Sequence, residues 1–124
     1  MDKSMKNFMR LRRLDDVLVW DLIGDGINSV EFDIHLRSVK AIKNIKKLYI
    51  NIMHLSEINN DTLIKFRKMK SVLAEKVISF VNVNPIQNCI LNMFEIDKIF
   101  QIYMNKMDAK EAKKPVVNRR FRVV

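Results

Sequence analysis

Two histidines and one cysteine are the side chains in this sequence best suited to metal binding or nucleophilic chemistry. His35 and His54 are 19 residues apart and no second thiol accompanies them, so the sequence predicts no closed tetrahedral metal site. We interpret each histidine as a surface or core-edge imidazole. Cys89 stands in an apolar run with Ile90 and Leu91, which predicts a buried, unreactive thiol and a reducing compartment.

Phosphate-binding and catalytic patterns are equally weak. The only two glycines lie in Gly24-Asp25-Gly26, which lacks the third glycine and the spacing of a dinucleotide-binding loop. The carboxylates are scattered, and no nucleophile stands beside a base in a recognisable pattern. The sequence therefore predicts a non-enzymatic protein without metal or cofactor.

Positive charge is concentrated at the two ends of the chain. The net charge is +9, yet residues 14–105 contain equal numbers of basic and acidic side chains, so the excess lies in residues 1–13 and 106–124. A basic tail attracts polyanions but supplies no base-reading surface, so nucleic-acid binding is not expected as the main function. The possible polyanion contacts are Lys110, Lys113, Lys114, Arg119, Arg120 and Arg122.

The chain of 124 residues has room for one hydrophobic core, and 48% of its residues are hydrophobic. We predict a single domain over residues 1–105 and a basic, flexible tail over 106–124, whose valines and Phe121 offer a further strand to a partner. The most apolar run, Val17 to Ile23, is interrupted by Asp21 and is too short for a membrane helix, so a cytoplasmic location is expected.

The first half of the chain begins with two apolar runs, residues 7–14 and 17–23, separated by Asp15-Asp16; this arrangement predicts a β-hairpin that ends at Gly24. Residues 30–42 are ambiguous. Strict alternation of apolar and polar residues favours a strand, whereas Asn28 with Glu31, and the spacing of Phe32, Leu36 and Val39, favour a helix. We interpret this segment as a helix.

Strands and helices then alternate along the chain. The sequence predicts strands at 47–53, 77–83 and 99–104, a polar loop at 56–61, and helices over 62–75 and from Asn84-Pro85 onward. The first of these helices places Leu63, Phe66, Met69 and Leu73 on one face and Lys65 and Lys68 on the other; the second has Ile86, Ile90 and Met93 spaced for burial. This order predicts an α/β fold with a mostly parallel sheet covered by helices.

Residues 80–85 (Phe-Val-Asn-Val-Asn-Pro) and 94–103 (Phe-Glu-Ile-Asp-Lys-Ile-Phe-Gln-Ile-Tyr) resemble the C-terminal half of STAS domains. There a strand ends in Val-Asn-Val-Ser-Pro or similar, and the next helix closes with Gly-Leu-Asp-Lys-Leu-Phe. The match covers about 24 residues, and a looser likeness spans residues 6–105. Glu95 stands where the family usually has glycine.

Residues 49–58 are similar to the central strand and following loop of the same family, specifically of anti-sigma factor antagonists. The family continues with Asp-Ser-Ser/Thr-Gly-Leu, where this chain has Asn59-Asn60-Asp61-Thr62-Leu63. Both hydroxyl positions are therefore degenerate, at Asn60 and Asp61. The resemblance implies a protein partner of the anti-sigma factor or serine kinase type, bound through the 55–63 loop, with contacts from Leu55, Ser56, Asn59, Asn60, Asp61, Thr62 and Leu63.

Asp61 has two interpretations. It places a fixed negative charge near the phosphoacceptor position, as a phosphate would, or it caps the following helix; we favour the cap. Phosphorylation of Ser56 or Thr62 stays open, as does the oligomeric state. An alternative function is an accessory STAS subunit of a larger assembly or membrane transporter complex, with the basic tail contacting anionic lipid or nucleic acid.

Overall fold

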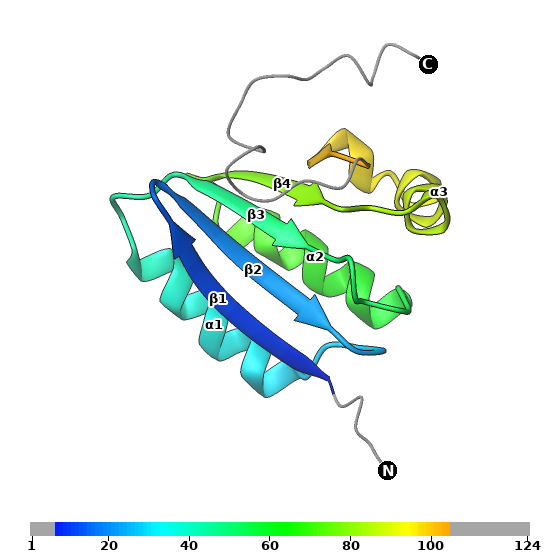
Figure 1. Ribbon diagram of the computed structural model, residues 1–124, viewed down its shortest axis with the longest axis horizontal. Helices are drawn as coiled ribbons and strands as arrows, with labels where there is room; N and C mark the ends of the chain where they lie inside the picture. Colours follow the sequence, from blue (N-terminus) through cyan, green and yellow to red (C-terminus); the bar gives the residue numbers. More distant parts are fainter. Residues whose placement is uncertain (1–6, 105–124) are drawn as a thin grey trace.

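The computed structural model describes residues 7–104, and its chain begins with an antiparallel hairpin (Figure 1). Strand β1 (Phe8–Leu14) pairs with β2 (Val17–Ile23), with Leu14 opposite Val17, so that Asp15 and Asp16 alone form the turn. Asp15 has a φ of 58°, a left-handed conformation that aspartate tolerates better than most residues. The predicted hairpin is confirmed.

The remaining strands extend the sheet in parallel. β3 (Lys47–Asn51), β4 (Val77–Val81) and β5 (Gln101–Ile102) follow in the order β1-β2-β3-β4-β5. Helices α1 (Ser29–Ala41), α2 (Asn60–Val72) and α3 (Pro85–Met93) connect them, and a short 3-10 helix, η1 (Ile96–Lys98), precedes β5. The α/β class with a mostly parallel sheet is confirmed, although all three parallel strands are shorter than predicted.

The core lies between the sheet and the helices, where α1 and α2 run side by side beneath the strands (Figure 1). Trp20 of β2 stacks on Phe32 of α1 with 5.3 Å between ring centroids, and Phe66 of α2 lies 4.7 Å from Phe80 of β4. All four rings are buried. Two layers thus bury their apolar faces against each other, as expected for helices on a sheet.

Helix α1 settles the ambiguous segment in favour of the helical interpretation. Its Asn28 side chain caps the helix by accepting a hydrogen bond from the Glu31 backbone N–H (2.9 Å). Phe32, Leu36 and Val39 are buried. Val30 and Ile34, the residues that make the alternating pattern look like a strand, point into solvent and are 71% and 49% exposed.

Three predictions about side-chain burial are wrong. Lys65 is buried rather than solvated, because its ammonium folds back onto Asp61 one turn earlier. Helix α3 buries Gln87 and Leu91, whereas Ile86 and Met93 are 73% and 68% exposed and Ile90 is only partly buried. Cys89 lies on this outer face and is exposed. The rotation of α3 about its axis differs from the one that its apolar residues suggest.

The residue between α3 and η1 is Glu95, at a position where the resemblance noted in the sequence leads one to expect glycine. Glu95 adopts a left-handed conformation, with φ 61° and ψ 25°, between α3 and η1. A glycine takes this conformation at no steric cost, whereas a glutamate pays for it. The left-handed conformation of Glu95 therefore adds local strain at the end of α3.

Within residues 7–104, no helix is long and apolar enough to span a bilayer. Residue 105 and the basic segment 106–124 lie outside the described part of the chain. The predicted domain boundary, the flexible tail and the polyanion contacts stay predictions.

Candidate functional site

The loop between β3 and α2 is tied to the end of β2. Gly24 donates its backbone N–H to the His54 carbonyl (3.0 Å), and the Ser56 N–H donates back to the Gly24 carbonyl (2.8 Å). The Ser56 hydroxyl lies 3.2 Å from the same carbonyl. Gly24 has a φ of 114°, a value that favours glycine, so a side chain here would disturb the anchor of this loop.

A second anchor comes from α3. The Gln87 side chain, 4% exposed, donates to the carbonyls of Ile52 and Leu55, both at 2.8 Å. Its own carbonyl oxygen accepts from the backbone of Asn84, which closes a capping box at the start of α3. One buried amide thus holds the loop and the beginning of α3 together.

The start of α2 is capped by Asn59, which corrects the hypothesis that Asp61 is the cap. The Asn59 side-chain oxygen accepts from the Thr62 backbone N–H (2.9 Å) and from the Thr62 hydroxyl (3.0 Å). Asp61 lies inside the first turn of the helix, where its carboxylate is 66% exposed and pairs with Lys65 at 2.5 Å. A negative charge in this turn still suits the helix dipole.

The predicted partner-binding residues separate into two groups. Leu55, Thr62 and Leu63 are only 1–2% exposed, so they support the loop from beneath and cannot contact a partner without rearrangement. The predicted contacts that are exposed are Ser56, Asn59, Asn60 and Asp61. Burial of Thr62, whose hydroxyl is already bound to Asn59, also makes it a poor target for a kinase in the folded state.

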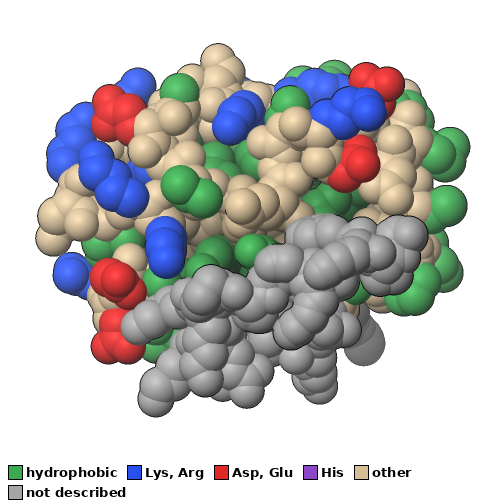
Figure 2. All heavy atoms as spheres, turned by 90° about the horizontal axis from the view of Figure 1, so that it is seen from above, with side chains coloured by type: hydrophobic (Ala, Val, Ile, Leu, Met, Phe, Trp, Pro, Cys, Tyr) green, Lys and Arg blue, Asp and Glu red, His purple; other side chains and the backbone are tan. Residues whose placement is uncertain are grey.

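Exposed apolar side chains lie beside this loop, and the sequence interpretation missed them because it assigned most of them to the core. We define the α2–α3 surface as six of the exposed residues of α2 and α3: Asn60, Asp61, Ile64, Ile86, Cys89 and Met93. Hydrophobic side chains gather at the right-hand end of the molecule in Figure 2, the end at which α3 lies in Figure 1.

One hydrogen bond joins α2 to the end of α3. Arg67 of α2 donates to the Phe94 carbonyl at the end of α3 (2.8 Å), and Ile64 lies one turn before Arg67. At the other end of α3, Ile86 adjoins Gln87, which holds the loop. Such an apolar surface with a polar rim is typical of protein-binding sites.

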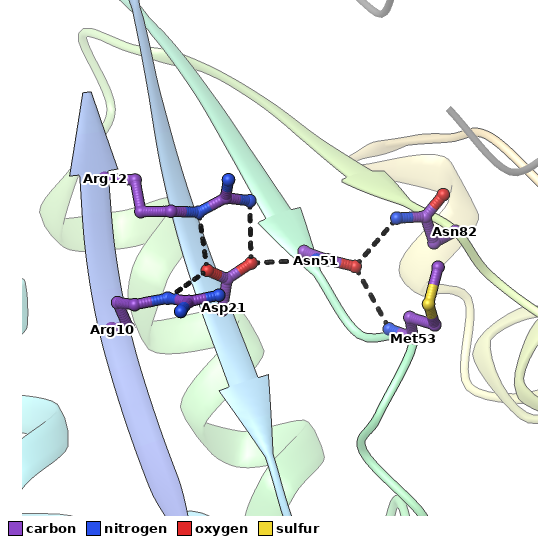
Figure 3. A network of polar contacts seen from close by, with 6 residues as sticks. All are labelled: Arg10, Arg12, Asp21, Asn51, Met53 and Asn82. Carbon is purple, nitrogen blue, oxygen red and sulfur yellow. Dashed lines mark hydrogen bonds and ion pairs between the residues drawn. The ribbon is translucent and has the colours of Figure 1, made fainter. Parts of the chain in front are cut away.

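A polar network at the carboxyl ends of β2, β3 and β4 is the second functional candidate, and the sequence interpretation did not find it (Figure 3). Asp21, 1% exposed, accepts hydrogen bonds from Arg10 (2.9 Å), from Arg12 (2.7 and 3.1 Å) and from Asn51 (2.8 Å). Burial by itself raises the pKa of Asp21, but the hydrogen bonds from Arg12, Asn51 and Arg10 and the charge of Arg12 outweigh it, so the pKa is lowered.

The network also reaches the loop. The Asn51 side-chain oxygen accepts from the Met53 backbone N–H (3.1 Å) and from the Asn82 side chain (2.9 Å). The sequence carries a signal for it: Asp21 interrupts an apolar strand, opposite arginines that alternate along the preceding strand. We interpret the network as a support that fixes where β3 leaves the sheet.

The two histidines belong to the β3–α2 loop and to helix α1. His54 is exposed in the loop, and His35 lies at the core edge with its Nδ1 3.4 Å from the Met9 sulfur and its ring against Trp20. Their interpretation as surface and core-edge imidazoles is confirmed. Among residues 7–104, no cluster of three or more potential metal ligands occurs.

No family model matches the chain, and no curated protein matches it. Solved structures do. An anti-sigma factor antagonist from Mycobacterium paratuberculosis has a TM-score of 0.68 and 18% identity, covering 90% of this chain and 97% of that one. A STAS domain protein from Planctomyces limnophilus has a TM-score of 0.64 and 14% identity, covering 84% and 93%.

The Bacillus cell fate determinant SpoIIAA in its phosphorylated form has a TM-score of 0.60 and 12% identity, covering 86% of this chain and 96% of that one. At such low identities the similarity concerns the fold. The chain has the STAS fold, as the resemblance of residues 80–85 and 94–103 predicts.

Proposed function

We propose that this domain is a non-enzymatic regulatory module that binds a protein partner of the anti-sigma factor or serine kinase type. The observation that carries the proposal is the α2–α3 surface, where Ile64 and Ile86 are 61% and 73% exposed beside a firmly anchored loop. Exposed side chains of this size become favourable contacts when a partner buries them, by about 1.5–3 kcal/mol each when fully buried. Similarity to an anti-sigma factor antagonist supports the partner class.

The proposed partnership does not use phosphorylation at the family position. Asn60 and Asp61 carry no hydroxyl, and Thr62 is buried under the Asn59 cap. The Asp61 carboxylate is paired with Lys65, which offsets much of its charge, so it is a weak imitation of a phosphate of about −1.5 to −2. Ser56 is the exposed hydroxyl of the loop, and it lies near the Gly24 carbonyl.

Charge-introducing substitutions in the α2–α3 surface test the binding mode. We expect Ile64→Glu and Ile86→Glu each to weaken binding of the host's anti-sigma factor kinase at least about tenfold, measured by calorimetry, which corresponds to a typical hot spot. Val30→Glu is the matched control, because Val30 is an equally exposed apolar residue on α1. Equal effects of all three substitutions, or no binding by the unaltered chain, contradict the proposal.

A kinase assay separately tests whether the loop is phosphorylated. The chain is incubated with the same kinase and ATP, and the loop peptide is examined by mass spectrometry. We expect no phosphate on this peptide, and Asp61→Ser is expected to create an acceptor. Phosphate on Ser56 or Thr62 of the unaltered chain would refute this part of the proposal while leaving the binding surface intact.

A further inference from the structure

A cavity of about 200 Å³ lies between the carboxyl-terminal ends of α1 and α2, at the end of the sheet where the parallel strands begin. Lys40 lines it from the last turn of α1 and Ser71 from the last turn of α2. Lys43 lines it from the loop before β3, and residues 73–76 line it from the loop before β4. Sites for drug-sized ligands measure roughly 300–1,000 Å³, so this cavity suits a smaller molecule.

Lys76 is the buried cation of this cavity, with 7% of its surface exposed. Its Nζ donates to the carbonyl of Ile42 (2.7 Å), which follows α1, and to the carbonyl of Ile45 (2.5 Å). These two bonds hold the loop between α1 and β3 and satisfy main-chain oxygens. The described residues thus use two of the three N–H donors of this ammonium group, and the third remains for a ligand.

Lys40 and Lys43 bring two more positive charges to the cavity, and both residues are exposed. Within residues 7–104, neither forms a salt bridge. Lys40 stands in the last turn of α1, where a cation suits the helix dipole, but Lys43 lies beyond the helix end and has no such role. Among the described residues that line the cavity, Glu75 is the only carboxylate, so three positive charges and one negative charge give a local charge of +2.

Repulsion among the lysines contributes to the pKa of Lys76. Burial lowers this pKa, the charges of Lys46 and Lys43 lower it further, and the charge of Glu75 opposes them. A bound anion reduces the repulsion, because it places negative charge among the ammonium groups. The carbonyl ends of the two helices oppose an anion here, but Lys76 already binds two main-chain carbonyls on this side.

We propose that this cavity binds the phosphate group of a small soluble anion, either inorganic phosphate or a phosphate monoester. The three lysine ammonium groups that line it supply charge-assisted donors, and the Ser71 hydroxyl supplies a neutral one. The site is separate from the α2–α3 surface, because Ser71 follows Ile64 by seven residues, or about 10 Å along α2. Phosphate binding here is therefore independent of the proposed partner binding.

A nuclear magnetic resonance titration of the full-length chain tests the site residue by residue. Residue-specific signals are needed because the seven basic residues in 106–124 also attract phosphate. Inorganic phosphate and glycerol 3-phosphate are added in turn, and sodium chloride at the same ionic strength is the reference. We expect both phosphates to shift the backbone amide signals of residues 71–76 to saturation, and chloride to cause no saturable shift there. Absence of saturable shifts in this segment overturns the proposal.

Charge variants at exposed positions give the site two opposite signatures. Lys43→Gln should weaken binding of glycerol 3-phosphate about threefold, and Glu75→Gln should strengthen it about threefold, as expected for partly solvated charges. Lys98→Gln is the matched control, because it removes one positive charge on η1, outside the cavity. Lys76 stays unaltered, since it holds the loop after α1. The proposal is contradicted if Lys43→Gln has no larger effect than Lys98→Gln, or if Glu75→Gln does not bind more tightly.

A vesicle experiment distinguishes a free anion from a lipid headgroup, because phosphatidic acid carries the same phosphate monoester. The chain is sedimented with phosphatidylcholine vesicles that contain phosphatidic acid, with and without Lys43→Gln. We expect this substitution to leave vesicle binding unchanged, because the cavity takes a free anion and the basic residues in 106–124 are the same in both chains. Loss of vesicle binding in Lys43→Gln, together with unshifted amide signals in glycerol 3-phosphate, indicates a lipid headgroup site and overturns the proposal of a soluble anion.

Discussion

Removing the charge of Asp21 is the perturbation whose consequence the structure defines best. Asp21→Asn keeps the size and shape of the side chain but turns one acceptor oxygen into a donor amide facing Arg10 and Arg12. Three guanidinium hydrogen bonds to a carboxylate lose their charge assistance, while the contact with Asn51 can persist.

The expected cost follows from burial. Breaking a fully buried ion pair costs roughly 3–5 kcal/mol, but here the side chains of Arg10 and Arg12 are 52% and 37% exposed and can turn back into water. We therefore expect a loss of about 2–3 kcal/mol in the free energy of unfolding, below the range for a sealed pair. For a domain of this size the melting temperature falls by about 8–12 °C.

The pH dependence gives the prediction its signature. The folded state lowers the pKa of Asp21 below its usual value of 3.8, so the unfolded chain takes up a proton first as the pH falls. The stabilisation is complete above pH 3.8 and is lost as the pH decreases through the folded-state pKa. The difference between Asp21→Asn and the unaltered chain should accordingly be constant between pH 5 and 7 and shrink below about pH 4.

Urea unfolding followed by Trp20 fluorescence, repeated at several pH values, measures this difference. Asp33→Asn is the control, since the Asp33–Lys68 pair is about half exposed at both side chains and should contribute no more than about 0.5 kcal/mol. The reasoning is refuted if Asp21→Asn costs no more than this control, or if its effect is the same at pH 7 and at the lowest pH at which the chain folds.

Three further outcomes are expected. Asn59→Ala should lower the free energy of unfolding by about 1–2 kcal/mol, because it removes the cap of α2 and the acceptor of the Thr62 hydroxyl, whereas Asn60→Ala should change it by less than about 0.5 kcal/mol in the same urea titration. Glu95→Gly should raise the free energy of unfolding by about 0.5–1 kcal/mol, and with it the melting temperature, because glycine adopts the left-handed conformation without strain. A lower free energy of unfolding contradicts this prediction. Cys89 should react with a thiol reagent in the folded protein nearly as fast as in urea, and protection until unfolding would show that it is not exposed.

Local patterns predicted well wherever neighbouring residues in the chain decide the outcome. Asn28 and Asn84 begin α1 and α3 because their short side chains reach backbone N–H groups three residues ahead. The same rule chose the wrong residue at α2, where Asn59, Asn60 and Asp61 all suit a cap. The backbone of Asn59 is extended, and this places its side chain over the helix end.

The rotation of α3 about its axis shows where local patterns fail to predict which side chains are buried. Ile86, Ile90 and Met93 have ideal spacing for burial, yet Gln87 occupies the interior because two loop carbonyls there need a donor. These carbonyls belong to Ile52 and Leu55, which precede Gln87 by 35 and 32 positions, so no short window of sequence contains the reason. The exposed apolar face that results is the centre of the proposed partner-binding surface.

The sequence by itself determined the order and type of the elements, the absence of a hydroxyl at residues 60 and 61, and the uneven distribution of charge, because each depends on residue identity and short-range periodicity. The tertiary structure decided which side chains face outward, that Asp21 joins three strands through Arg10, Arg12 and Asn51, and that the sheet has a second apolar face. The physical reason is strand register, which brings together polar groups that lie far apart in the chain. Because buried polar groups need hydrogen-bond partners, they select among helix and side-chain orientations that periodicity alone does not distinguish.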